Sequence, residues 1–372
     1  MRQPDPLILG AGPAGCAAAI VLARAGAAPL IVDRDEQPGD PLCGGFLSWR
    51  TMAQLRGLGI DCAKLGAHPV HLLRIHARGR VAQVALPAPA CGLSRHALDT
   101  ALREAALAAG ARIECDTIAN LSPGEAHGRR QQWRSDSIFL ATGKEDVRGH
   151  PRPRDAADPA LGLRLRLPPS GERTALLAGA IELHLFRGGY AGIVLQEGGR
   201  ANVCLAVKKS ALTRAGNSPT ALLDALASAN PAFAARLGSD WRKARIGAIG
   251  AVPYGWIAQT TEPGLFRLGD QAAVIPSLAG EGIGIALASG QMAANAWLER
   301  GAQAAPEYQR DLARRAQPAI RLARVARVLA ENPLGARLAL LAAAIGPRLV
   351  TTIAEHTRID PAPTLAHMRG AA

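Results

Sequence analysis

The sequence predicts an α/β fold in which a parallel sheet with flanking helices is interrupted by an antiparallel sheet and followed by helices. Three observations predict it. Short apolar runs alternate with alanine-rich helical patterns near the N-terminus, glycine pairs separate strand patterns in the middle, and helical patterns fill the C-terminal part. The length of 372 residues suits two or three domains.

The composition is that of an ordinary globular protein, with 48% hydrophobic and 20% charged residues, which excludes disordered, collagen-like and coiled-coil chains. The net charge of +13 is attributed to arginine-rich composition, and no nucleic-acid partner is expected, because single-strand binders need aromatics and only 3% of the residues are aromatic. Scattered cysteines without ligand spacing predict reduced thiols, a cytoplasmic location and no metal site. No apolar stretch reaches the roughly 20 residues of a membrane span.

The strongest motif lies near the N-terminus. An apolar strand over 6–9 is followed by Gly10-Ala11-Gly12-Pro13-Ala14-Gly15, an alanine-rich helix, and a second strand over 29–32 that ends at Asp33. A Rossmann-like dinucleotide site requires this order, because the glycines permit a tight turn, close approach of a pyrophosphate, and close packing of helix on strand. Asp33 is placed to accept hydrogen bonds from a ribose hydroxyl. The motif alone leaves FAD and NAD open.

Later motifs favour FAD. A helix is expected from Arg95, which is placed to reach a phosphate, with Ser94 as its N-cap. A strand over 137–140 leads into a turn at Gly143, and another over 265–268 ends at Gly269-Asp270. Pro276 and Gly280-Glu281-Gly282-Ile283-Gly284 then open a long helix that runs to about Arg300.

Together these motifs resemble the FAD-dependent oxidoreductase superfamily of geranylgeranyl reductases and group-A flavin monooxygenases (p-hydroxybenzoate hydroxylase-like). The resemblance spans residues 1 to about 300. It implies a glutathione-reductase-type FAD-binding domain, an inserted β-sheet substrate domain and a C-terminal helical cap. It also implies that Asp270 binds the ribityl chain, and that the helix after 280–284 points its N-terminus at the pyrimidine edge of the flavin, where it stabilises negative charge.

The resemblance divides the chain into segments with expected roles. The expected FAD-binding parts are 1–70, 92–160 and 255–300, the substrate parts are 71–91 and 161–254, and C-terminal helices fill 301–372. The residues expected at FAD are Gly10, Gly12, Pro13, Ala14, Gly15, Asp33, Arg34, Cys43, Gly44, Gly45, Arg95, Gly143, Gly269, Asp270, Pro276, Gly280, Gly282, Ile283 and Gly284.

The middle of the chain is expected to be sheet-rich. Strands over 181–187 and 191–195 flank Gly188-Gly189 as a hairpin, and Gly198-Gly199 introduces a further strand over 201–207. Five of the scarce aromatics are noted here or just after it. They predict an apolar pocket against the flavin, lined by Phe186, Tyr190, Trp241, Tyr254 and Trp256.

Two chemistries remain open for such a pocket. Cys43-Gly44-Gly45 is similar to the Cys-Gly-Gly segment of geranylgeranyl reductases, so Cys43 and Tyr190 are the expected catalytic residues of a carbon–carbon double-bond reductase. The Tyr-x-Trp-x-Phe-Pro pattern of those reductases is missing around Tyr190, and this favours a monooxygenase that hydroxylates an apolar aromatic or polyketide-like substrate through a flavin hydroperoxide. A second alternative is an FAD-binding electron-relay partner.

The expected partners follow from what the sequence lacks and from its C-terminal charges. No second strand–GxGxxG–helix unit exists, so reduction by transiently docking NAD(P)H or by an electron donor protein is expected. The arginine-rich helix expected over 306–330 is either a solvated cap or a surface resting on an anionic membrane, and the second case implies a membrane-peripheral location.

Overall fold

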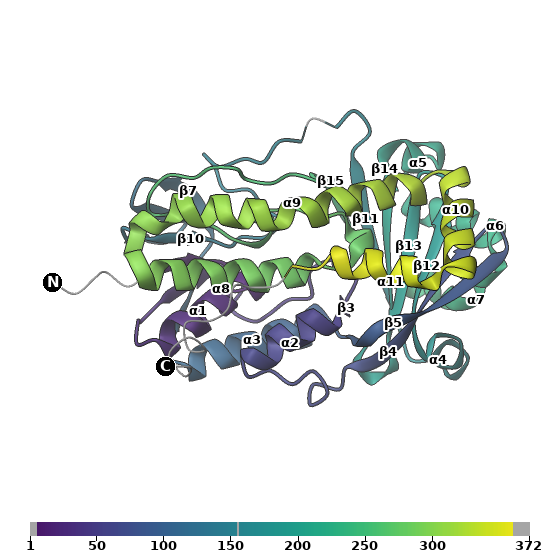
Figure 1. The fold of residues 1–372 in the computed structure, drawn as a ribbon, viewed down its shortest axis with the longest axis horizontal. Helices are drawn as coiled ribbons and strands as arrows, with labels where there is room; N and C mark the ends of the chain where they lie inside the picture. The colour runs from purple at the N-terminus through teal and green to yellow at the C-terminus, as the bar shows by residue number, and fades with distance from the viewer. Residues whose placement is uncertain (1–5, 155, 360–372) are drawn as a thin grey trace.

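A five-stranded parallel sheet is the framework of the N-terminal part. The structure is a computed structural model that describes residues 6–154 and 156–359 (Figure 1). The strand order is β16-β10-β1-β2-β6 and all four pairings are parallel. The strands are β1 (Leu7–Leu9), β2 (Leu30–Asp33), β6 (Arg112–Cys115), β10 (Ile138–Leu140) and β16 (Leu265–Arg267). The Rossmann-like prediction is therefore confirmed.

The two faces of this sheet are covered differently. One face carries the helices α1 (Pro13–Arg24), α3 (Arg95–Ala108) and α8 (Gly282–Arg300), which enclose a core with α2 (Trp49–Gly57). The other face is covered by a small antiparallel sheet of β7 (Ile118–Ser122), β8 (Glu125–Gly128) and β9 (Gln132–Arg134). The sequence analysis did not predict this small sheet.

Glycines let the first helix pack very closely on its neighbours. A Cβ on Gly15 would lie 2.0 Å from the carbonyl oxygen of Gly10, and a Cβ on Gly290 of α8 would lie 2.2 Å from the carbonyl oxygen of Ala14. Larger side chains at these positions would push α1 away from the glycine turn and from α8. The contact between α1 and α8 thus holds the motif at 280–284 close to the glycine motif at 10–15.

The second sheet has eight strands in the order β15-β11-β14-β13-β12-β4-β5-β3. Its only parallel pairing among the described residues is β4 with β12. The predicted hairpin is confirmed, with Leu185 opposite Tyr190, and so is the strand that follows Gly199. The strands are β3 (Phe46–Leu47), β4 (His68–Ala77), β5 (Arg80–Gly92), β11 (Ala160–Leu167), β12 (Gly179–Phe186), β13 (Gly189–Leu195), β14 (Ala201–Lys208) and β15 (Gly247–Val252).

Short helices close one face of the eight-stranded sheet over a hydrophobic cluster of leucines and valines. They are α4 (Gly171–Leu177), α5 (Lys209–Arg214), α6 (Pro219–Ala229) and α7 (Pro231–Leu237). Short 3-10 turns complete the connections: η1 (Glu197–Gly199), η2 (Trp241–Lys243), η3 (Gly269–Gln271), η4 (Ser277–Ala279) and η5 (Gly301–Ala304).

The long helix α9 (Ala305–Ala330) joins the two sheets. It packs beside α8 along the five-stranded sheet and reaches the eight-stranded sheet. There α10 (Pro333–Ile345) lies at the far end, and α11 (Pro347–His356) runs back toward the middle of the molecule (Figure 1). Ala330, Ala336 and Ala343 pack there against a cluster that includes Tyr190. The predicted C-terminal helices are confirmed. Among the described residues no single helix is long and apolar enough to cross a membrane, although one sharply bent combination ending in α10 passes by length and composition.

A candidate FAD site and active site

The N-terminus of α1 is built to receive an anion. Gly12 is its N-cap and no side chain caps the helix, so the first N–H groups point outward. Gly10 has φ +110°, and a Cβ there would lie 2.5 Å from the carbonyl oxygen of Ala141. A Cβ on Gly12, by contrast, would meet only the Nη2 of Arg95, at 3.6 Å. Arg95 therefore faces the glycine turn, as a phosphate-binding arginine must.

Arg95 is held in place by an acid on its own helix. Its Nε and Nη2 donate to the two carboxylate oxygens of Asp99 at 2.8 and 2.7 Å. Burial opposes the charge on Arg95, but Asp99 raises its pKa above the usual value, and the charges of Cys43 and Asp270 act in the same direction. Residues from three distant motifs are therefore within electrostatic range of one guanidinium.

The acid at the end of β2 ties that strand to the glycine turn. Asp33 accepts the N–H of Ala11 at 2.6 Å and pairs with Arg103 at 2.9 Å. A carboxylate has further lone pairs, so a ribose hydroxyl can still be accepted. Arg34 pairs with Asp35 and, across the edge of the sheet, with Glu145 in the turn after β10. The site expected for the adenosine of FAD thus lies beside a network of ion pairs, and this network includes Glu145 of the turn that contains Gly143.

The turns after β10 and β16 are locked together. Arg152 is buried and donates to the carbonyl oxygens of Asp270 at 3.0 Å and Lys144 at 2.6 Å. Gln271 donates to the carbonyl oxygen of Gly143 at 3.0 Å. Among the described residues the Asp270 carboxylate makes no hydrogen bond or ion pair, and it is half-buried. It is free to accept the hydroxyls of a ribityl chain.

One glycine of the loop before α8, Gly282, faces open space. Gly280 is left-handed with φ +63°, and no side chain caps α8. A Cβ on Gly282 would meet nothing within 4 Å. The N-terminal N–H groups of α8 are therefore exposed toward the region between the two sheets, where a helix dipole stabilises negative charge.

A buried acid, Glu281, connects this loop to α2 and to the segment after α11. Glu281 accepts the Ser48 hydroxyl at 3.0 Å and pairs with Arg358 at 3.0 Å, while Arg358 also donates to the carbonyl oxygen of Ala279 at 2.6 Å. The Glu281 Oε1 has no hydrogen-bond partner among the described residues. Burial raises the pKa of Glu281 to about 7, against the opposing charge of Arg358. The segment after α11 thus supports the loop through one ion pair.

The Cys43–Gly45 loop lies between the eight-stranded sheet and the turn after β10. Asn202 of β14 donates to the carbonyl oxygens of Cys43 at 3.0 Å and Gly44 at 2.8 Å, and Lys144 donates to that of Leu42. A Cβ on Gly44 would meet nothing within 4 Å. Burial raises the pKa of the Cys204 thiol to about 12, and the charge of Cys43 adds to this effect. The Cys43–Gly45 loop is therefore held by β14 on one side and by the turn after β10 on the other.

Three hydroxyls connect the loop before α8 to the sheet. The Ser277 Oγ lies 2.5 Å from the Tyr190 hydroxyl and 2.8 Å from the Tyr254 hydroxyl. Tyr190 is buried in β13, whereas Ser277 is exposed. Burial raises the pKa of Tyr254 to about 12 and that of Tyr190 well above its usual value. Both phenols are therefore neutral and able to donate at physiological pH. Tyr190, Ser277 and Tyr254 are called the hydroxyl chain below.

The remaining predicted pocket aromatics divide between the two faces of the sheet. Trp256 and Tyr254 line a cleft together with Arg327, whose guanidinium lies 4.9 Å from the centre of the Tyr254 ring. The prediction that Phe186 and Trp241 line a flavin-facing pocket is wrong, because both pack in the cluster under α4–α7. Side chains alternate along a strand, so aromatics close in sequence can face opposite ways.

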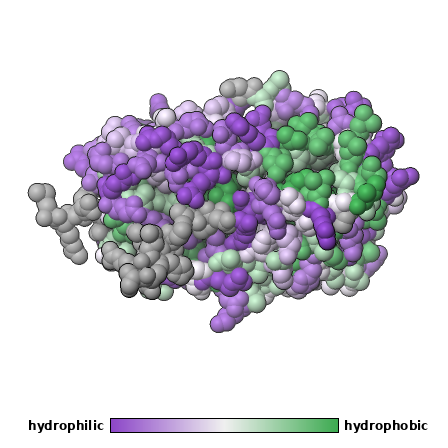
Figure 2. Space-filling model, in the orientation of Figure 1, coloured by the Kyte–Doolittle hydropathy of each residue, from purple (hydrophilic) through white to green (hydrophobic). Residues whose placement is uncertain are grey.

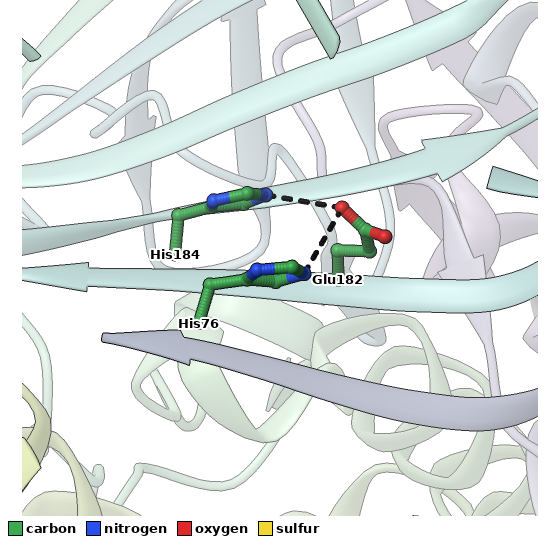
Figure 3. A group of neighbouring side chains, drawn as sticks. All are labelled: His76, Glu182 and His184. Carbon is green, nitrogen blue, oxygen red and sulfur yellow. Dashed lines mark hydrogen bonds and ion pairs between the residues drawn. The ribbon is translucent and has the colours of Figure 1, made fainter. Parts of the chain in front are cut away.

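That opposite face also holds a buried ionic cluster (Figure 3). The Nε2 of His184 and of His76 lie 3.1 and 3.5 Å from the same oxygen of Glu182. Three such ligand atoms within 4.8 Å have the spacing of a metal site. The two imidazole rings, however, are stacked at 4.3 Å with planes 7° apart, so their lone pairs run parallel and cannot converge on one ion.

Arginines already satisfy the carboxylate in this cluster. Arg236 donates to both oxygens of Glu182 at 2.7 and 3.0 Å, and Arg74 donates at 3.1 Å. Burial opposes ionisation, but hydrogen bonds from His184, His76 and Arg236 hold the pKa of Glu182 well below its usual range. A divalent cation would meet two guanidinium charges here. The cluster therefore anchors α7 to the sheet rather than binding a metal.

Several site residues escaped the sequence analysis. Ser277 directly follows the predicted Pro276, so its place in the late motif was a usable signal. Asn202 and Arg152 carried no signal, because only the fold brings them to the Cys43 loop and to Asp270. The role of Glu281 was hidden because its two partners, Ser48 and Arg358, are distant in sequence.

The site residues fit FAD. An uncapped helix with a facing arginine suits the pyrophosphate. The Asp270 carboxylate, which has no partner among the described residues, suits the ribityl chain, and the N-terminus of α8 suits the flavin ring. A Cβ at Gly44 or at Gly282 would meet no atom within 4 Å, so neither loop crowds the space beside it.

Comparison with protein families agrees with this fit. Residues 4–136 match the model of the FAD binding domain. The chain is 37% identical over 115 residues to menaquinone reductase of Mycobacterium tuberculosis (strain ATCC 25618 / H37Rv), a match that covers 29% of this chain and 28% of the relative. Menaquinone reductase of Mycolicibacterium smegmatis (strain ATCC 700084 / mc(2)155) is 33% identical over 120 residues, which cover 31% and 29% of the two chains. The matches span less than a third of these relatives.

Solved structures match over nearly the whole chain. Halogenase PltM has a TM-score of 0.74 with 15% identity, covering 95% of this chain and 83% of its own. Flavin-dependent brominase Bmp2 has a TM-score of 0.71 with 16% identity, covering 100% and 98%. PqsL of P. aeruginosa, solved with 2-aminobenzoylacetate, has a TM-score of 0.70 with 16% identity, covering 90% and 98%. Residues 4–136 thus match an FAD binding domain, and the chain shares its overall fold with proteins such as the flavin-dependent brominase Bmp2.

Proposed function

We propose that the protein is an FAD-dependent monooxygenase that hydroxylates an apolar, electron-rich aromatic substrate between the loop before α8 and the eight-stranded sheet. The observation that carries the proposal is the hydroxyl chain. It places two neutral phenols and an exposed serine hydroxyl at the junction of the expected flavin loop and the substrate sheet.

The residues that would hold FAD come from motifs that are far apart in the sequence. The α1 N-terminus and Arg95 bind the pyrophosphate, Asp33 the adenosine ribose, and Asp270 the ribityl chain. When bound, FAD supplies the two-electron redox chemistry and the activation of oxygen. The chain supplies binding, orientation and electrostatics.

The substrate-side residues orient and protect the reacting ring. A phenolic substrate can donate a hydrogen bond to the Ser277 hydroxyl or accept one from it. The hydroxyl chain then carries a proton between the buried sheet and the exposed side of the loop before α8. The apolar cluster around Tyr190, which includes Leu183 and Leu185, excludes water from this side. The guanidinium of Arg327 lies over the Tyr254 ring, and this cation–π contact holds the ring in place at the cleft.

A specific observation also favours a second candidate, the carbon–carbon double-bond reductase. The relatives that share sequence with the N-terminal part are named menaquinone reductases. Cys43 lies in the Gly-Gly loop held by Asn202, within range of Arg95. In this candidate Tyr190 or Cys43 would donate the proton to one alkene carbon while a hydride reaches the other.

The immediate electron source is a separate proposal. The described residues form one Rossmann-like unit, which is assigned to FAD. We therefore propose that NAD(P)H docks transiently or that a donor protein delivers the electrons. Stopped-flow bleaching of the bound flavin by NADH and by NADPH would distinguish these sources, since a donor-protein system would show no rapid bleaching with either.

One experiment separates the two reactions. The FAD-loaded protein is photoreduced without oxygen and mixed with 4-hexylresorcinol or with menaquinone, with and without air. A hydroxylated resorcinol formed only in air supports the monooxygenase. A saturated isoprenoid bond formed without air supports the reductase, and flavin reoxidation with neither product would contradict both.

A further inference from the structure

We propose that the face formed by the end of α9, α10 and α11 is a monotopic docking surface for an anionic lipid bilayer. This inference goes beyond the proposed function and does not depend on it. It begins from an apolar area that the fold leaves uncovered.

Large hydrophobic side chains are concentrated on this face. Ten such side chains are exposed among the described residues, and eight of them lie on these three helices, with 43 to 76% of each accessible. They are Val325, Val328, Leu329, Leu334, Leu338, Leu341, Ile345 and Leu349. Figure 2 shows the hydrophobic area over the end of α9 and over α10, bordered by hydrophilic residues. An area of this kind marks an interaction site.

The charges around the area are mainly positive, although α11 also carries one exposed acid, Glu355. Arg321, Arg324, Arg337 and Arg348 are exposed on the same helices. Between Asp311 and Glu355 the sequence contains one acid, Glu331, which is buried and paired with Arg327 at 2.5 Å. No exposed carboxylate therefore balances the arginines along this stretch.

This charge pattern selects the occupant. In a symmetric dimer formed through the face, the four exposed arginines of each copy would meet like charges, with Glu355 as the exposed acid that the face offers. Anionic lipid headgroups pair with all of these arginines, while the leucines enter the boundary of the acyl chains. Helix α10 has 13 residues, so it is about 20 Å long, shorter than the hydrocarbon core of about 30 Å. It can lie in the interface but cannot cross it.

The face adjoins the cleft of the proposed active site. Arg327, which lines the cleft with Tyr254 and Trp256, lies on α9 between Val325 and Val328. A lipophilic substrate could pass from the bilayer to the hydroxyl chain without crossing water. This route rests on the proposed function, whereas the docking surface does not.

Vesicle sedimentation of the FAD-saturated full chain tests the surface. Vesicles of phosphatidylcholine mixed with phosphatidylglycerol are compared with vesicles of phosphatidylcholine alone. We expect binding to the anionic vesicles that weakens with salt. The double variant Leu338→Glu with Leu341→Glu should lower the partition coefficient at least about tenfold, since two apolar contacts are lost and two negative charges gained. Arg337→Ala should lower it about fivefold, equivalent to about 1 kcal/mol.

A matched control and three contrary outcomes make the test decisive. Leu107→Glu changes a leucine of similar exposure on α3, outside the face, and should bind like the wild type. The flavin spectrum and circular dichroism confirm that each variant is folded. The inference is overturned if the wild type stays in the supernatant, or if the double variant sediments with vesicles as the wild type does. It is also overturned if the lipid-free wild type is a dimer that the double variant makes monomeric.

Discussion

Replacing Ser277 with alanine tests the hydroxyl chain most sharply. The change removes the one oxygen that contacts both tyrosine hydroxyls, at 2.5 and 2.8 Å. The Tyr190 side chain is 3% exposed, so its hydroxyl loses a partner that water replaces poorly, at a cost of about 1–3 kcal/mol in unfolding free energy. The Tyr254 hydroxyl lies beside the cleft, where water can replace the serine.

The catalytic effect of this substitution should exceed its effect on stability. If the hydroxyl chain carries a proton, Ser277→Ala should lower kcat by roughly 10²–10⁴-fold, while the affinity for FAD stays within a few-fold of the wild-type value. Tyr190→Phe should have a similar effect, and the double variant should be little worse than either single one because the groups act as a unit. Turnover of 4-hexylresorcinol and flavin titration give these quantities.

A control for instability is available on the far face of the sheet. Ser170 caps α4 by accepting the N–H of Arg173 at 3.4 Å, so Ser170→Ala should cost about 1 kcal/mol and leave kcat unchanged. The mechanism is refuted if Ser277→Ala turns over within twofold of the wild type, or if the effects of Ser277→Ala and Tyr190→Phe multiply.

Three further predictions concern the cofactor, the buried cluster and pH. Gly12→Val should preserve folding, because a Cβ there meets only Arg95 at 3.6 Å. It should weaken FAD binding at least about tenfold in a flavin titration, since the side chain blocks the approach of the pyrophosphate. The control Gly39→Val, at a position where a Cβ meets nothing within 4 Å, should leave FAD binding unchanged. Glu182→Gln should lower the unfolding free energy in urea by about 3–5 kcal/mol, since it leaves Arg236 and Arg74 without a counter-charge; a loss below 1 kcal/mol would show that the cluster is dispensable. Burial raises the pKa of Glu281 from 4.5 to about 7 in the folded state, so the folded state binds this proton more tightly than the unfolded state does. The contribution of Glu281 to the unfolding free energy should therefore be complete below pH 4.5, and about 3 kcal/mol should be lost as the pH rises through 7. Glu281→Gln should abolish this fall, and an unchanged pH profile of urea unfolding would contradict the assignment.

The parts of the fold that local patterns encode could be predicted from the sequence. The glycine turn, the hairpin at Gly188-Gly189 and the capped helix at Arg95 each depend on residues close together in the chain. Phe186 and Trp241 were misplaced because composition shows that aromatics cluster, but not which face of a sheet each occupies. Tyr190 was placed on the correct strand, but its link to Ser277 required the packing of two distant segments.

Long-range electrostatics escaped prediction for the same reason. Glu182 gave no signal in the sequence, since its partners come from β4, β12 and α7. The support of the loop before α8 by Arg358 likewise depends on how the segment after α11 returns to α2 and α8.

The most direct test of the proposed function is a single turnover of the photoreduced, FAD-loaded wild type with 4-hexylresorcinol under isotopically labelled dioxygen. Mass spectrometry of the product is the measurement. The proposed monooxygenase predicts one labelled oxygen atom in a hydroxylated resorcinol, with the other atom released as water. Flavin reoxidation that yields labelled peroxide and unchanged resorcinol, together with anaerobic saturation of menaquinone, would contradict it.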